Sequence, residues 1–97
     1  MRRGSRSGRK TMVVYVERTG DASSMAGFAV SKAVGVAVVR NRVKRRLRAI
    51  TADLLPTVPP GTRLVVRALP ASADASFETL RRDLRDGTAS ALRKASL

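Results

Sequence analysis

The sequence predicts a small α+β domain, built as a two-layer α/β sandwich in which two helices cover one small sheet. Short runs rich in β-branched residues at 11–18 and 63–68 have the composition of strands. Between them, residues 36–55 repeat apolar side chains at helical spacing. At 97 residues, the chain has the length of one domain. The expected order of elements is strand, strand, helix, strand, helix.

The first ten residues predict a flexible arm. The segment MRRGSRSGRK contains no apolar side chain after Met1. Basic segments of this composition are typically solvated, and they often become ordered on nucleic acid. We therefore expect a basic flexible arm at 1–10 and a single α/β domain over 11–97.

Two strands are expected to follow the arm as an antiparallel hairpin. In the run TMVVYVER, alternation directs Met12, Val14 and Val16 to one face of a sheet. Val13 and Tyr15 then point to the opposite face. The polar segment at 19–24 has the composition of a turn, and a second strand is expected near 25–31.

The longest predicted element is an amphipathic helix. Its apolar residues fall within an arc of about 80° at about 100° per residue, which suits docking on a sheet. That apolar stripe consists of Val36, Val39, Val43, Leu47, Ile50 and Leu54. Prolines at 56, 59 and 60 end the helix.

A third strand and a second helix complete the expected domain. Residues 63–68 (RLVVRA) form the strand, and Ser76 is the expected N-cap of the last helix. Phe77, Leu80, Leu84 and Ala91 are assigned to the inner face of this helix. Its charged residues, Asp83 included, are assigned to solvent, and Gly87 is expected to weaken its middle by about 1 kcal/mol relative to Ala.

The charge of the chain points to a polyanionic partner. Twenty Lys and Arg oppose seven Asp and Glu, for a net charge of +13, of which residues 1–52 carry +11. A field this one-sided attracts nucleic acid first and an anionic membrane surface second. The chain has no His and no Cys, which excludes zinc fingers, disulfides and thiol or imidazole catalysis. No apolar run approaches the roughly 20 residues of a membrane helix, and the N-terminus lacks a secretory segment, so we expect a cytoplasmic protein.

The basic run at 40–48 is the strongest candidate site. It places six basic residues in nine around Asn41, with no acid among them. Arginine forks bind phosphate oxygens bidentately, and an asparagine between them can contact a phosphate, a 2′-hydroxyl or a base edge. The alternatives are a merely solvated basic face and a helix that binds a membrane or a calmodulin-like partner.

Two other features carry weaker signals. The turn Ser31-Lys32-Ala33-Val34-Gly35 places Lys32 and backbone N–H groups where they can hold an anion, although an ordinary turn explains it equally well. Tyr15 on a strand either packs in the sheet or stacks a single-stranded base. The carboxylates are scattered, and nothing resembles a nucleophile–base set. We expect neither catalytic residues nor a metal site in the protein.

From Phe28 to Arg48 (FAVSKAVGVAVVRNRVKRRLR), the chain closely resembles the protein component of bacterial ribonuclease P. The specific part is the Arg40-Asn41-Arg42 signature preceded by the Ser31–Gly35 turn. The start RRGSRSGRKTMVVYV, the third strand and the segment ASFETLRRDLR also fit.

The resemblance implies a fold like ribosomal protein S5 domain 2, with a left-handed β-α-β crossover in place of the usual right-handed one. It also implies binding to a catalytic RNA that removes the 5′ leader of precursor tRNA using Mg²⁺, with no cofactor bound by the protein alone. Neither a membrane nor a protein partner is implied. The residues that match RNA-binding positions of the family are Lys32, Arg40, Asn41, Arg42, Lys44, Arg45 and Arg48. Val13 and Tyr15 match the cleft that holds the single-stranded leader.

The chain departs from the family pattern at several positions. Family members begin with a further helix that completes the cleft, and this sequence starts near the end of that helix, so we expect a domain short of its first helix or a misplaced start codon. Ala33 and Val36 stand where basic residues are common, and Ala49 where an acid is common. The alternative function is a ribosomal or nucleoid-type protein that binds RNA or DNA without taking part in cleavage.

Overall fold

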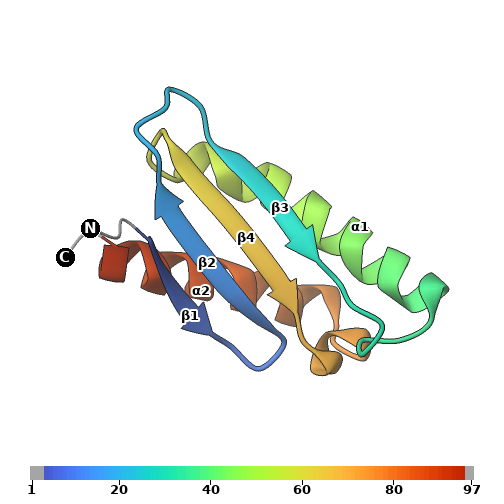
Figure 1. Cartoon of the computed structure of the whole chain (residues 1–97). Coiled ribbons are helices and arrows are strands. Elements are labelled where there is room, and N and C mark those ends of the chain that lie inside the picture. Colours follow the sequence, from blue (N-terminus) through green and yellow to red (C-terminus); the bar gives the residue numbers. More distant parts are fainter. Residues whose placement is uncertain (1–3, 96–97) are drawn as a thin grey trace.

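The computed structural model describes residues 4–95, which form one four-stranded sheet with two long helices on the same side of it (Figure 1). The strand order across the sheet is β1-β2-β4-β3. The strands are β1 (Gly4–Gly8), β2 (Met12–Arg18), β3 (Met25–Ala29) and β4 (Thr62–Ala68). The helices are α1 (Ala37–Leu54) and α2 (Phe77–Ala95), with short 3-10 turns η1 (Leu55–Thr57) and η2 (Pro70–Ala73). The two-layer α+β sandwich is thus confirmed.

The antiparallel hairpin predicted for residues 11–18 and 25–31 is wrong, because the corresponding strands β2 and β3 are not neighbours in the sheet. β4 lies between β2 and β3, antiparallel to β2 and parallel to β3. The side chains of β4 alternate strictly between buried and exposed, whereas β3 (MAGFA) has no fully buried residue. A strand with the stronger apolar alternation gains more from pairing on both edges, so β4 takes the inner place and β3 the edge.

The connection from β3 through α1 to β4 is a left-handed crossover. In Figure 1, β3 and β4 run side by side in the same direction. The helix α1, which follows β3 and precedes β4 in the chain, lies behind the sheet. This confirms the hand implied by the resemblance and overrides the general right-handed preference of parallel β-α-β units.

Part of the predicted flexible arm is ordered as an edge strand. Residues 4–8 pair antiparallel with β2, so here the prediction was wrong, while residues 1–3 of the arm lie outside the described residues. Two side-chain bonds join β1 to α2: the Ser5 hydroxyl donates to the Ala91 carbonyl, and Lys94 Nζ donates to the Arg6 carbonyl at 3.0 Å. These tertiary contacts stabilise a strand whose own side chains are too polar to predict it.

The core lies between the sheet and the helices. Met12, Val14 and Val16 are buried as the alternation predicts, and Leu47 and Leu84 pack on them from the two helices. Two predicted core residues lie at the surface because each stands at a helix start: Val36 is 70% exposed and Phe77 41%.

Two residues of α2 have roles that the sequence did not show. Asp83 is buried rather than solvated, and its carboxylate accepts hydrogen bonds from the Thr11 backbone N–H (3.2 Å) and hydroxyl (2.7 Å). A Cβ at Gly87 would lie 2.8 Å from Val14 Cγ2, so the glycine allows α2 to cross β2 closely. The predicted N-cap is confirmed, since Ser76 Oγ accepts from the Thr79 N–H at 3.1 Å.

Candidate nucleic-acid interface

The outer face of α1, defined by Val38, Asn41, Lys44, Arg45 and Arg48, is the first of two cationic surfaces. These residues line a shallow groove of about 520 Å³ on the side of the helix that faces away from the sheet. Asn41, Arg45 and Arg48 are exposed, and Lys44 is half-buried. Among residues 4–95, none of these cations belongs to a salt bridge. The outer face of α1 therefore offers several uncompensated charges along one line, as phosphate binding requires.

The remaining arginines of the basic run are half-buried and bonded to backbone carbonyls. Arg40 Nε donates to Gly35 O at 3.1 Å, Arg42 Nη2 to Ala73 O at 2.9 Å, and Arg46 Nη1 to Ala75 O at 3.2 Å. Arg42 and Arg46 thereby join α1 to the segment that leads into α2. The basic run thus divides into an outward-facing set and a set that also holds the fold together, a division that its sequence does not reveal.

The turn before α1 brings Lys32 close to the start of the helix. The Gly35 N–H donates to the Lys32 carbonyl at 3.1 Å, and the Lys32 side chain is exposed. The N-cap residue Val36 makes no side-chain capping bond, and the first turn has no acidic residue. The helix N-terminus, with its partial positive charge, is therefore left uncompensated beside Lys32.

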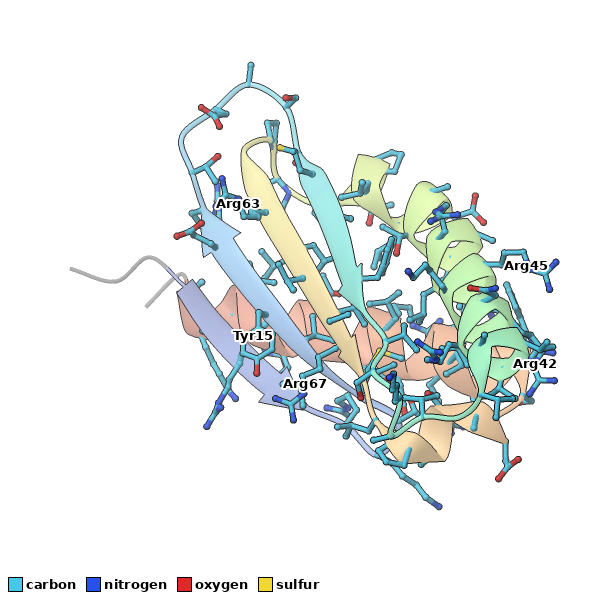
Figure 2. The ribbon with its side chains drawn as sticks, turned by 45° about the vertical axis from the view of Figure 1, so that its right-hand side comes forward. Tyr15, Arg42, Arg45, Arg63 and Arg67 are labelled. Carbon is cyan, nitrogen blue, oxygen red and sulfur yellow. The ribbon has the colours of Figure 1, made fainter. Side chains whose placement is uncertain are left out.

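The second surface is the open face of the sheet, opposite the helices. The pairing of the strands places its residues in three rows that cross the sheet. The rows are Gly8-Val13-Arg67-Ala29, Arg6-Tyr15-Val65-Gly27 and Gly4-Glu17-Arg63-Met25. Tyr15 is paired with Arg6 on one side and with Val65 on the other, and Figure 2 shows Arg67 and Arg63 toward opposite ends of this face from Tyr15.

Tyr15 lies beside a hollow of about 420 Å³ in this face. The other residues that line this hollow include Val65, Arg6, Arg63 and Glu17. An aromatic ring beside apolar and cationic side chains is the arrangement on which single-stranded bases stack while their phosphates meet arginine. Tyr15 and Val13 thus lie on one exposed surface, as the alternation predicted.

Sequence reasoning missed Arg6, Arg63 and Arg67 as part of this face. The alternation of RLVVRA placed Arg63 and Arg67 on the same side of their strand, and this was the available signal. Placing them beside Glu17 and Val13, however, requires that β4 pair with β2, a pairing that the sequence did not predict.

The two surfaces meet at one end of the sheet. The row that contains Arg67 ends at Ala29 of β3, and the chain continues from there through the Lys32 turn into α1. Figure 2 shows Arg67 at this end of the open face, Arg63 at the opposite end, and Arg42 and Arg45 on α1.

Comparison with known proteins identifies the family. The model of the family described as ribonuclease P matches residues 1–92. The chain belongs to this family. Members of the ribonuclease P protein family act with a catalytic RNA in removing the 5′ leader of precursor tRNA. This assignment favours the ribonucleoprotein over the alternative of a ribosomal or nucleoid-type binding protein.

Relatives in the ribonuclease P family extend over most of the chain. The ribonuclease P protein component of Kocuria rhizophila is 49% identical over 96 residues, covering 99% of this chain and 85% of the relative. That of Streptomyces bikiniensis is 50% identical over 93 residues, covering 87% of this chain and 76% of the relative. The solved structure of the Thermotoga maritima RNase P protein superimposes with a TM-score of 0.76 at 26% identity, over 93% of this chain and 83% of that one.

Proposed function

We propose that this chain binds the catalytic RNA of ribonuclease P with the outer face of α1 and the 5′ leader of precursor tRNA with the open face of the sheet. The observation that carries the proposal is that two differently built cationic surfaces adjoin at the Lys32 turn. One protein can thereby hold a structured RNA and a single strand next to each other.

On α1, the proposed contacts are to RNA phosphates. Within residues 4–95, Arg45 and Arg48 form no salt bridge, so their guanidinium groups can bind phosphate bidentately. Asn41, about one turn before Arg45 on the same face, can donate to a phosphate or a 2′-hydroxyl. Lys44 and Lys32 add point charges along the same path. Arg40 and Arg42 contribute charge while part of each guanidinium is bonded to backbone.

On the sheet, the proposed contacts are to a single strand. Tyr15 stacks a base, and Val13 and Val65 supply apolar floor beside it. Arg67 and Arg6 lie next to these residues and can follow the phosphates. The protein binds and orients the leader, which lowers the entropic cost of bringing the cleavage site to the catalytic RNA.

We assign the Mg²⁺ that supports hydrolysis to the RNA subunit. Within residues 4–95, no three His, Cys, Asp or Glu side chains come together in a way that could hold a metal ion. We place the function in the cytoplasm, where bacterial tRNA precursors are made. The helices described here are too short or too polar to span a membrane.

Reconstitution tests this function. Adding the chain to the catalytic RNA of its own organism at low Mg²⁺ is expected to restore cleavage of precursor tRNA at the 5′ end of the mature tRNA. A basic ribosomal protein of similar net charge serves as the control and should not restore it. Equal stimulation of cleavage by both proteins would contradict the proposal and indicate that the chain is a general RNA-binding protein.

A further inference from the structure

The two ends of the open sheet face differ in charge. In the row nearest the Lys32 turn, Arg67 is exposed and stands beside Val13, Gly8 and Ala29, none of which carries charge. In the row at the far end, Arg63 stands directly opposite a carboxylate, Glu17. The face is thus open to phosphate at one end and neutralised at the other.

The pairing at the far end is a defined contact. Arg63 Nη1 lies 3.2 Å from Glu17 Oε1, and the two side chains are 55% and 53% exposed. An ion pair this exposed contributes little to stability. Its larger consequence is electrostatic, because it engages the guanidinium of Arg63 and places a negative charge where a phosphate would otherwise lie.

This pair lies within reach of a strand stacked on Tyr15. Both Arg63 and Glu17 line the same hollow as Tyr15. The rows of Arg67 and Arg63 are four residues apart on β4, which corresponds to about 13 Å at about 3.3 Å per residue. A single strand that follows Arg67 and Tyr15 therefore meets the pair after a short path.

We propose that Glu17 sets the far limit of the single-stranded RNA track on the sheet by withholding Arg63 from phosphate binding. Glu17 is then a specificity-determining residue for the number of leader nucleotides that the protein contacts. The inference rests on the proposed leader-binding role of this face. It predicts that removing the carboxylate lengthens the contacted segment by freeing Arg63.

The experiment measures binding of the full-length chain to oligouridines of graded length and varied salt. In the unmodified chain, affinity should stop rising at a certain length. In Glu17→Gln, that plateau should move to a longer oligonucleotide, and the salt slope should steepen by about 0.7 for the added phosphate contact.

Glu78→Gln is the matched control. It removes the same charge from a similar ion pair, Glu78 with Arg81 at 2.9 Å, which lies on α2 on the other side of the sheet. The double variant Glu17→Gln, Arg63→Gln has the net charge of the unmodified chain, and it should return the plateau to its original length. If Glu17→Gln behaves like Glu78→Gln, or if the double variant keeps the longer plateau, the inference is overturned.

Tyr15→Ala separates this inference from the proposed function. If Tyr15→Ala weakens binding while Glu17→Gln leaves the plateau in place, the face binds the strand and only the limit set by Glu17 is wrong. If Tyr15→Ala binds oligouridine as the unmodified chain does, the leader-binding role itself is wrong.

Discussion

The outer face of α1 and the open face of the sheet are both cationic, yet they are built differently. On α1, the exposed cations follow one another along a helix with no acid beside them until Asp53. On the sheet, arginines surround an apolar and aromatic centre, and one of them is neutralised by Glu17. The first design favours charge density along a structured RNA, and the second favours base stacking with limited charge.

The difference shows that net charge alone does not describe how this protein binds RNA. A helix presents charges on a convex ridge that fits the grooves and backbone of folded RNA. A flat sheet face provides stacking area that only an unpaired strand can use. The two surfaces should therefore respond to mutation independently of each other.

The largest expected effect comes from removing charge on α1. Arg45→Ala combined with Arg48→Ala should weaken binding to the catalytic RNA by at least about 100-fold, because each lost charge-assisted contact contributes about 1.5–3 kcal/mol. Filter binding across salt concentrations should show a slope reduced by about two. Oligouridine binding should be nearly unchanged. Arg82→Ala with Arg93→Ala on α2 removes equal charge, and an equal loss there would show that only net charge matters.

Gly87→Ala tests the close packing of α2 on β2. The added methyl would overlap Val14, and overpacking of this kind costs about 1–3 kcal/mol. Thermal unfolding should show a melting temperature lower by about 4–8 °C per kcal/mol. Gly27→Ala, where an added Cβ has no neighbour within 4 Å, is the control and should melt close to the unmodified chain. Identical melting of both variants would contradict the close crossing of α2 over β2.

Tyr15→Ala tests stacking on the open face. Binding of a single-stranded leader should weaken by about 10-fold, since stacking on an aromatic side chain contributes about 1–3 kcal/mol per base. Tyr15→Phe keeps the ring and should bind almost normally in the same fluorescence anisotropy measurement. Affinity for the catalytic RNA should stay the same in both variants. An equal loss of that affinity would show that the open face of the sheet also binds the catalytic RNA, which contradicts the assignment of separate surfaces.

Arg42→Ala should weaken binding to the catalytic RNA only slightly and should measurably lower stability. Its bond to Ala73 O joins α1 to η2, and losing a bond of this kind costs about 1 kcal/mol. We expect a lower melting temperature by calorimetry and a smaller affinity loss than Arg45→Ala causes. Unchanged melting with a large loss of affinity would place Arg42 with the outward-facing set.

Much of the local structure could be predicted from the sequence. The apolar period of 36–55 anticipated α1 within one residue at each end, and the alternation of TMVVYVER separated buried Val14 from half-buried Tyr15 on the opposite face. The basic run and its asparagine located the candidate interface on α1. These features depend on residues close together in the chain, so the sequence pattern alone predicts them.

The pairing of distant segments was decided only by the tertiary structure. Nothing local in GSRSG predicts a strand, and nothing local places β4 between β2 and β3. The row that joins Arg6, Tyr15 and Val65, and the pair of Arg63 with Glu17, exist only through that pairing. Gly87 is a second example. Its weakening of the helix could be predicted locally, but the need for a glycine at this position comes from the close approach of α2 to Val14 on β2.

The +13 charge and the amphipathic helix were thus determined by the sequence itself, since composition and periodicity need no partner segment. The division of that charge into a phosphate-binding ridge, fold-supporting arginines and a sheet face with one neutralised end was determined by the fold. The physical reason is that hydrogen bonds and ion pairs act over a few ångströms, and only folding brings residues such as Glu17 and Arg63 that close.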